Sequence, residues 1–237
     1  MKHCCLTVAL GIACSAAICS PHRRALVVSD AELTGISTDD RAQIDAKAAL
    51  LRTAEDARTT QKAALAVAER EVQIATLAVS RDKTALDIAE LKFQAAQETK
   101  NADTMLPAKK AREEASAQLQ RSVAAQKYHK ANRDYLEEMV VVGEAEIPVA
   151  NANLELAKYE AATRSNGGPD GEKLAGFKSQ VATAEAELAE VQVSAAKAKT
   201  AMDVLRPRDL PAEAPAPTNL GPAAVAPAAS PDAGPRH

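Results

Sequence analysis

The sequence predicts an all-α protein: an elongated antiparallel three-helix coiled-coil bundle with two long helices, one shorter helix and a disordered C-terminal tail rich in Pro and Ala. Hydrophobic residues make up 46% of the 237 residues but aromatic residues only 2%, so alanine supplies much of the apolar content. Large aromatic side chains dominate compact cores, whereas alanine has the highest helix propensity. In three segments apolar residues recur at every seventh position, which is typical of a coiled-coil seam. Burial is therefore expected along rods rather than inside a compact globule.

The N-terminal residues 1–19, MKHCCLTVALGIACSAAIC, predict a secretory signal peptide, because a basic start is followed by a charge-free apolar stretch and small residues. The stretch is shorter than the ~20 apolar residues of a membrane-spanning helix, although the basic residues 22–24 behind it keep an uncleaved anchor as an alternative. Cys14 and Cys19 each follow residues similar to a bacterial lipobox, so both are candidate lipidation sites. Ordinary cleavage after Ala17 is the other alternative, and either cleavage implies export.

The first long helix is expected at about 38–104, after a linker at 20–37. Hydroxyl and carboxylate side chains at 37–40 can accept the free backbone N–H groups of its first turn. A large apolar side chain recurs every seventh residue, with Arg58 as the one departure, and a small side chain that lets two helices approach follows three residues after most of them. The large seam residues are Ile44, Leu51, Leu65, Val72, Val79, Leu86 and Phe93, and the small ones are Ala54, Ala68, Ala75, Ala89 and Ala96.

The second helix is expected at about 108–164, antiparallel to the first across a hairpin tip, NADTMLP, at 101–107. Pro107 marks the end of the tip because proline cannot continue a helix interior but suits a first helical turn. A sevenfold spacing runs along this helix too. Its members are Tyr128, Tyr135, Val142, Val149 and Leu156. Pro148 falls inside the spacing, and because the register continues across it we expect a kink there rather than an end, with a break as the alternative.

The third helix is expected at about 171–206, after the turn sequence SNGGPDG at 165–171. It carries two apolar rows that fit the heptad at every position. One row is Leu174, Val181, Leu188, Ala195 and Met202, and the other is Phe177, Ala184, Val191, Ala198 and Leu205. From 207 to 237 the chain holds eight of its twelve prolines, which predicts a disordered or polyproline-II-like spacer.

The first helix has more apolar surface than one partner covers. Val67, Ile74 and Ile88 form one sevenfold row away from the main seam, and Leu77 and Leu91 form another. Because short turns make neighbouring helices antiparallel, we expect the third helix to lie beside the first half of this helix, reach about Leu77 and cover Val67 and Ile74. Burying a Leu or Ile side chain is worth ~1.5–3 kcal/mol. The remainder, Leu77, Ile88 and Leu91, is therefore a candidate face for self-association or for a helical protein partner; an exposed stripe without a role is the alternative.

Composition and motifs argue against catalysis and nucleic-acid binding. The net charge is −3, and basic residues are spread among acidic ones rather than concentrated on one face or in one run. All four cysteines lie at 1–19, so the rest of the chain has no thiol nucleophile and no CxxC metal site. No HExxH, GxSxG or phosphate-binding glycine loop occurs, and a slender bundle offers no deep pocket. We expect no enzymatic activity, no cofactor, no metal and no nucleic-acid partner.

Two stretches, TALDIAELKFQAAQ at 84–97 and AKKAREEASAQL at 108–119, are similar to the helical hairpins of efflux adaptors and TolC-like outer-membrane factors, and more generally to alanine-rich periplasmic coiled coils of bacterial envelope proteins. The resemblance lies in composition and heptad spacing, and it carries over no functional residues. It implies an exported spacer, scaffold or assembly component in the periplasm or at the outer membrane of a Gram-negative bacterium, attached to the membrane if a cysteine is lipidated. A periplasmic holdase-type chaperone or a helical subunit of a transport or secretion assembly is the alternative, and binding of the first helix to a lipid surface is a third.

Overall fold

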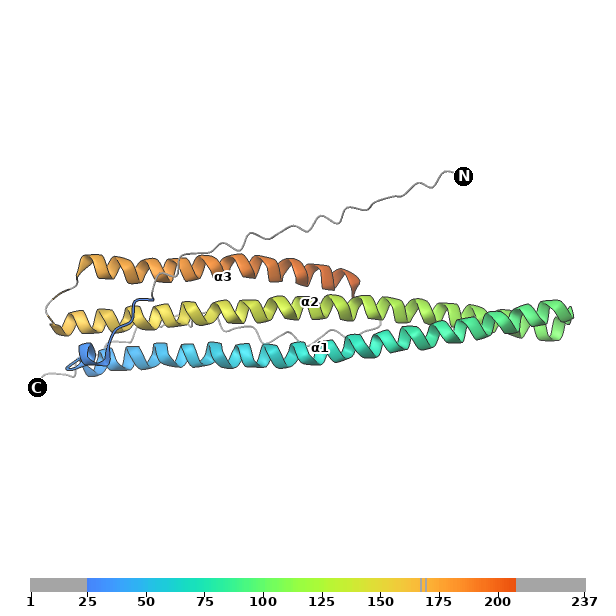
Figure 1. Ribbon diagram of the computed structural model, residues 1–237, viewed down its shortest axis with the longest axis horizontal. Helices are drawn as coiled ribbons and strands as arrows, with labels where there is room; N and C mark the ends of the chain where they lie inside the picture. The colour runs from blue at the N-terminus through green and yellow to red at the C-terminus, as the bar shows by residue number, and fades with distance from the viewer. Residues whose placement is uncertain (1–24, 167, 169, 208–237) are drawn as a thin grey trace, which may run out of the picture.

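The computed structural model describes residues 25–166, 168 and 170–207. Three α-helices make up most of this part of the chain: α1 (Thr38–Thr99), α2 (Ala102–Asn166) and α3 (Gly171–Leu205), preceded by a short 3₁₀ helix, η1 (Asp30–Leu33). Successive helices run antiparallel and build a long rod (Figure 1). The predicted all-α class, with two long helices and one shorter one, is confirmed, and no strand occurs among the described residues. The predicted signal peptide and the predicted disordered tail lie outside the described residues.

Capping side chains fix where the two long helices begin. Ser37 has an extended backbone, and its hydroxyl accepts a hydrogen bond from the backbone N–H of Asp40 at 3.1 Å, which satisfies a free donor in the first turn of α1. α1 ends just before Lys100, which adopts a left-handed conformation. Asn101 follows, and its side-chain oxygen accepts a hydrogen bond from the backbone N–H of Asp103 at 3.0 Å. The chain therefore reverses direction within two residues.

The tip of the hairpin is thus shorter than predicted. The expectation that it spans 101–107 and that Pro107 opens the second helix is wrong, because α2 starts at Ala102 and Pro107 lies inside it. The asparagine cap fixes the start of the helix, and the proline removes one backbone hydrogen bond without ending it. α2 also continues through Pro148, as predicted, so the alternative of a break there is wrong. With 65 residues, α2 is about as long as α1, which has 62.

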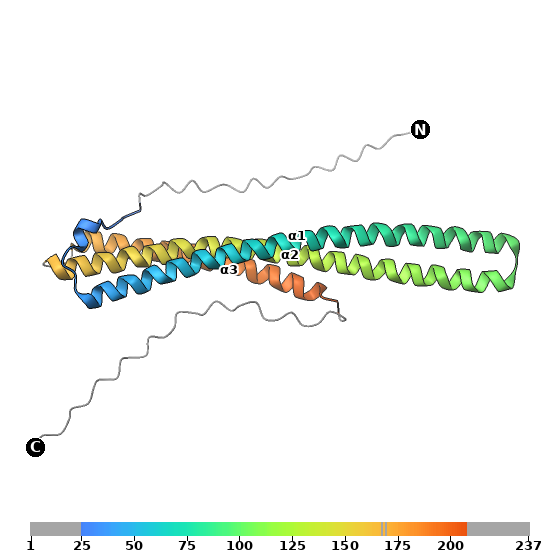
Figure 2. The same ribbon diagram turned by 90° about the horizontal axis from the view of Figure 1, so that it is seen from below.

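The three helices form a layer rather than a triangular bundle (Figures 1 and 2). α2 lies in the middle and contacts α1 along one side and α3 along the other, and no contact joins α1 to α3 among the described residues. The expectation that the third helix lies beside the first and covers Val67 and Ile74 is therefore wrong. These two side chains are 51% and 66% exposed. The face of α1 that carries them is therefore not covered by α3.

The physical reason for this arrangement is that α2 carries two buried faces. Ser122 and Gly143, both buried and three heptads apart, face α1. On the other side Tyr159 stacks on Phe177 of α3, with ring centroids 4.9 Å apart. α3 has 35 residues and ends well before the hairpin tip, so the far half of the rod is two-stranded, as predicted (Figure 2).

A small hydrophobic core closes the base of the rod. Val28, Tyr159 and Phe177 are buried against one another, and three partly buried leucines surround them: Leu33, Leu156 and Leu174. The backbone N–H of Val28 donates a hydrogen bond to Glu155 Oε2 at 2.8 Å, while Lys158 Nζ pairs with Glu155 Oε1 at 2.7 Å. The Tyr159 hydroxyl donates to the carbonyl oxygen of Asp170 at 2.9 Å. Part of the expected linker at 20–37, including Val28 and Leu33, therefore packs onto the base of the rod.

Candidate docking surface on the hairpin

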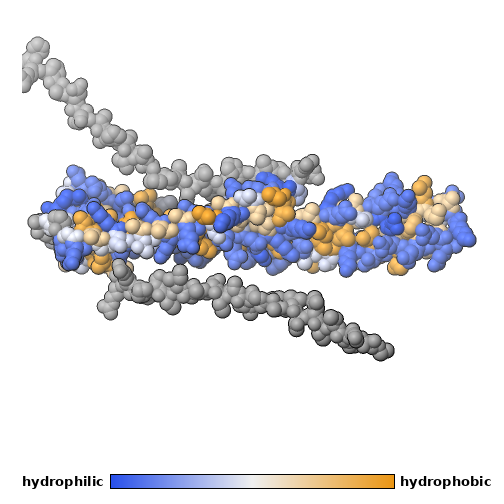
Figure 3. Space-filling view, turned by 90° about the horizontal axis from the view of Figure 1, so that it is seen from above, coloured by the Kyte–Doolittle hydropathy of each residue, from blue (hydrophilic) through white to orange (hydrophobic). Residues whose placement is uncertain are grey.

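The most conspicuous surface feature is a row of large apolar side chains on α1, which we name the outer stripe. Its members and their exposed fractions are Val67 (51%), Ile74 (66%), Leu77 (70%), Ile88 (49%) and Leu91 (65%). At ~1.5 Å rise per residue the stripe is about 36 Å long. Apolar patches of this kind lie between charged ones along the rod, including its two-stranded half (Figure 3).

The outer stripe has the spacing of a second coiled-coil seam. Ile74 and Leu77 are three residues apart, and the same step recurs fourteen residues later at Ile88 and Leu91. Since two seven-residue rows three positions apart are the pattern that packs helix on helix, this face is suited to another helix. The inner seam lies on the opposite side of α1, where the small residues of the heptad are 2–8% exposed: Ala68, Ala75, Ala89 and Ala96.

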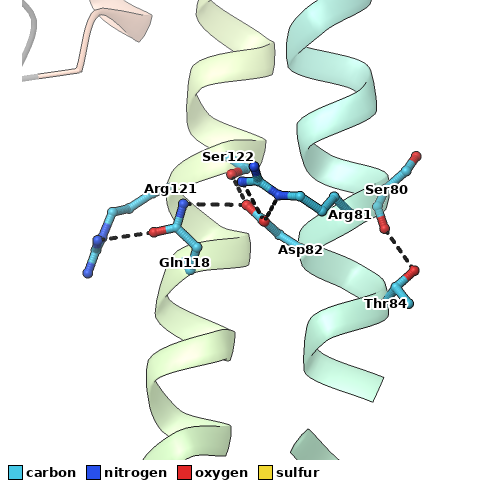
Figure 4. Close-up of polar contacts among 7 residues, drawn as sticks. All are labelled: Ser80, Arg81, Asp82, Thr84, Gln118, Arg121 and Ser122. Carbon is cyan, nitrogen blue, oxygen red and sulfur yellow. Dashed lines mark hydrogen bonds and ion pairs between the residues drawn. The ribbon is translucent and has the colours of Figure 1, made fainter. Parts of the chain in front are cut away.

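A polar cluster in the inner seam holds α1 and α2 in register beneath the outer stripe (Figure 4). Asp82 is only 4% exposed, and its carboxylate accepts hydrogen bonds from Ser122 Oγ and, at 3.4 Å, from Gln118 Nε2, both on α2. Arg81 Nε and Nη2 each lie 2.8 Å from Asp82 Oδ1. The hydrogen bonds from Arg81 and from Ser122 hold the pKa of the Asp82 carboxyl below its usual range.

A buried polar side chain in a seam is satisfied in one alignment only, because sliding the helices by one turn leaves it without partners. Asp82 therefore fixes the axial alignment of the two-stranded half. Sequence reasoning missed this residue, although a signal was present. Asp82 stands three residues after Val79, at a position where the row of small seam residues calls for alanine.

A second close approach of α1 and α2 lies nearer the base. Gly143 is buried, and a Cβ atom there would lie 3.3 Å from the Cα of Arg58 and would collide with the side chain of Gln61. Glycine at this position therefore brings the two backbones together. Beside it, Lys62 Nζ pairs with Glu144 Oε1 at 2.8 Å. Arg58, the departure in the predicted seam row, thus lies at a close contact between the helices.

Further pairs tie α1 to α2 along the seam. His129 Nδ1 lies 3.3 Å from Glu71 Oε2, and Gln126 Nε2 donates to Thr76 Oγ1 at 2.9 Å. Toward the tip, the guanidinium of Arg112 lies 4.6 Å from the centroid of the Phe93 ring, which is the geometry of a cation–π contact. None of these contacts involves a member of the outer stripe, although Glu71 lies at the edge of the seam, beside the stripe.

The predicted seam residues lie at the helix interfaces. Half-buried on α1 are Leu65, Val72, Val79, Leu86 and Phe93. On α3, Phe177 is buried, and Leu174, Val181, Leu188 and Val191 are half-buried. Leu205, at the end of α3, is 41% exposed. The predicted partner face of Leu77, Ile88 and Leu91 is exposed, and it extends further than predicted because α3 leaves Val67 and Ile74 open. The candidate lipidation sites Cys14 and Cys19 lie outside the described residues.

The helices show neither a membrane span nor a metal site among the described residues. Within the described ranges 25–166 and 170–207, none of the helices has an apolar stretch long enough to cross a bilayer. The same part of the chain contains no group of three or more side chains placed to hold a metal ion.

No protein-family model, no curated protein and no solved structure matches the chain.

Proposed function

We propose that the chain is a non-enzymatic scaffold of the bacterial cell envelope, exported by its N-terminal signal, whose rod sets a distance and whose outer stripe binds another helical surface. The observation that supports this best is the outer stripe itself, a heptad-spaced apolar face left in water on a hairpin whose inner seam is already closed. Exposed Leu and Ile side chains each gain ~1.5–3 kcal/mol when fully buried, so a partner on this face is favoured.

The rod has the dimensions and the internal locks that a spacer needs. The 62 residues of α1 span about 93 Å at ~1.5 Å per residue. The Asp82 cluster prevents α1 from sliding along α2, and the core around Phe177 fixes α3 at the base. Since the outer stripe lies on this stiff support, the geometry of whatever binds there is defined by the rod.

Export is tested first, by fractionating a Gram-negative host that expresses the full chain and measuring the intact mass of the protein. We expect an envelope-fraction protein that starts at or just after the predicted cleavage region, with a lipid mass on Cys14 or Cys19 if one of them is modified. A full-length, unprocessed chain in the cytoplasmic fraction would contradict the proposal.

Binding separates the scaffold from its main alternative, a holdase-type chaperone. An exposed apolar face on a long helical arm also suits a holdase, which would suppress the aggregation of many unfolding proteins. A scaffold would leave the light scattering of a thermally unfolding model protein unchanged and would retain a folded helical partner until Leu77→Asp is introduced. Strong suppression of scattering that Leu77→Asp abolishes would favour the holdase.

A further inference from the structure

We propose that the outer stripe of α1 binds the same stripe of a second copy of the chain, with the two hairpins antiparallel and with Ile74 and Leu77 packed against Leu91 and Ile88 of the second copy. The inference rests on the proposed scaffold function and assigns the partner of its docking surface.

The first argument is the symmetry of the spacing. Ile74 lies as far before the midpoint between residues 82 and 83 as Leu91 lies after it, and Leu77 and Ile88 are placed symmetrically about the same point. A twofold axis through that midpoint pairs a surface with itself, which is the interface type of most symmetric dimers. It brings Ile74 against Leu91 and Leu77 against Ile88, so four of the five members of the outer stripe meet an apolar residue, while Val67 falls opposite Glu98 at the edge of the overlap.

The polar residues inside the stripe favour the antiparallel over the parallel arrangement. Arg81 falls in the central layer of the stripe, on the same face as Thr84. A parallel pair in register would place Arg81 directly opposite its own copy, and like charges across a helix interface are destabilising. In the antiparallel register Arg81 faces Thr84 of the second copy instead, while its guanidinium keeps its contact with Asp82.

The charges beside the stripe are complementary in the same register. Along one flank lie Glu71, Ala78, Ala85 and Lys92, spaced by seven residues. Antiparallel pairing about the stated axis brings Glu71 beside Lys92 of the second copy and the two alanines beside each other. The Glu71 side chain remains 44% exposed beside its contact with His129, and Lys92 is exposed, so both can reach across. Charged pairs at the flanks of a seam set the partner and its orientation.

The opposite flank adds no repulsion. Its residues are Gln73, Ser80, Asp87 and Gln94. The same axis places Gln73 beside Gln94 of the second copy and Ser80 beside Asp87, so no two like charges meet there. Both flanks are therefore compatible with the register that the apolar spacing favours.

The fold leaves room for this pairing. α3 contacts α2 and has no contact with α1 among the described residues, so the second hairpin approaches a face that is open on both the three-stranded and the two-stranded halves. The two far halves would overlap side by side, and the two bases would point in opposite directions. At ~1.5 Å per residue the N-termini of the two α1 helices would lie about 130 Å apart. The dimer is then a double-ended spacer.

A charge exchange tests the register directly. Sedimentation equilibrium of the mature chain is expected to show a dimer, and Lys92→Glu is expected to weaken it about tenfold, since it replaces two exposed ion pairs by two like-charge pairs. Glu71→Lys makes the same change across the interface but also removes the contact with His129, so circular dichroism is used to check that its hairpin is intact. The double variant E71K/K92E is expected to restore the dimer, because the exchanged charges again face each other. Lys83→Glu is the matched control, since Lys83 is exposed on α1 but points away from the stripe, and it should leave the dimer unchanged.

Orientation is tested by cross-linking in a chain whose four native cysteines are replaced by serine. The pair Ile74→Cys and Leu91→Cys in one chain is expected to form covalent dimers on mild oxidation, while Ile74→Cys alone is not. A covalent dimer through residue 74 alone would overturn the antiparallel arrangement, and failure of E71K/K92E to restore the dimer would overturn the register. A strict monomer through the micromolar range would overturn the proposal as a whole. The scaffold function would survive that last result if Leu77→Asp still abolished retention of a folded helical partner.

Discussion

Removal of the aromatic ring at the base of the rod should release α3 while leaving the α1–α2 hairpin intact. Phe177 is 4% exposed, stacks on Tyr159 and contacts the core that includes Val28. α3 is held by α2 and by the N-terminal segment around Val28, and among the described residues it makes no contact with α1. The substitution Phe177→Ala therefore weakens one interface of the layer and not the other.

The size of the effect follows from the packing. Phe→Ala substitutions in cores cost about 3–5 kcal/mol, and we expect about 3 kcal/mol here because the cluster lies at the end of a slender rod. The remaining anchors of α3 are small or distant: Ala184, Ala195 and Met202 are its other buried residues. A loss of about 3 kcal/mol corresponds to a roughly 150-fold larger population of undocked α3, at a factor of ten for every ~1.4 kcal/mol.

Hydrogen–deuterium exchange with mass spectrometry measures this population, because undocking removes the tertiary packing that supplies most of the stability of a helix, and the amides of α3 then exchange faster. We expect exchange of α3 peptides to accelerate by about two orders of magnitude while peptides from α1 keep their protection. Val193→Ala, on the exposed face of the same helix at 56% exposure, is the control and should not accelerate exchange. Equal acceleration in α1 and α3 would show that the layer opens as one unit and would refute the reasoning.

Three further substitutions test individual contacts. Pro148→Ala should raise the free energy of unfolding, by up to about 3 kcal/mol in chemical denaturation, because α2 is helical on both sides of an exposed proline. Gly143→Leu should lower it by about 1–3 kcal/mol, because a larger side chain must push the backbone at Arg58 away. Asp82→Asn should lower the melting temperature at neutral pH, as measured by circular dichroism. The folded-state pKa of Asp82 is held below its usual range, so the carboxylate stabilises the fold above about pH 4. That stabilisation disappears as the pH falls through the lowered value, and the wild-type and Asp82→Asn melting temperatures should converge in acid.

The rows that pack could be predicted from sequence because a heptad is a local pattern. Val72, Val79 and Leu86 are half-buried where the sevenfold spacing placed them. The same pattern did not show which helix each row would face. α2 has apolar side chains on two sides, and only the structure shows that Tyr159 turns toward α3 and Gly143 toward α1. Neighbours in three dimensions depend on the rotation of each helix about its axis, and spacing along one chain does not give that rotation.

The hairpin tip and the polar layer were mispredicted or missed for local reasons. The start of the second helix was predicted at Pro107 because proline commonly marks a helix start. The helix in fact starts at Ala102, where the side chain of Asn101 caps the first turn. The role of Asp82 was missed because a charged residue in an apolar seam looks like an interruption of the heptad until its hydrogen-bond partners are known. Those partners, Gln118 and Ser122, lie 36 and 40 residues away in the chain, and nothing in the local spacing links them to Asp82.

The position of α3 decides whether the outer stripe can act as a seam at all. Had α3 packed between α1 and α2, it would have covered Val67 and Ile74, and only Leu77, Ile88 and Leu91 would have remained. Those three residues lack the symmetric spacing that lets the face pair with itself, because Leu91 would have no apolar residue opposite it. By packing on the far side of α2, α3 stiffens the base and leaves the stripe exposed in both halves of the rod. The asymmetric layer and the symmetric spacing on α1 therefore fit one explanation: the third helix supports the hairpin from the side of α2, and the first helix keeps exposed the face on which we propose that a second copy binds.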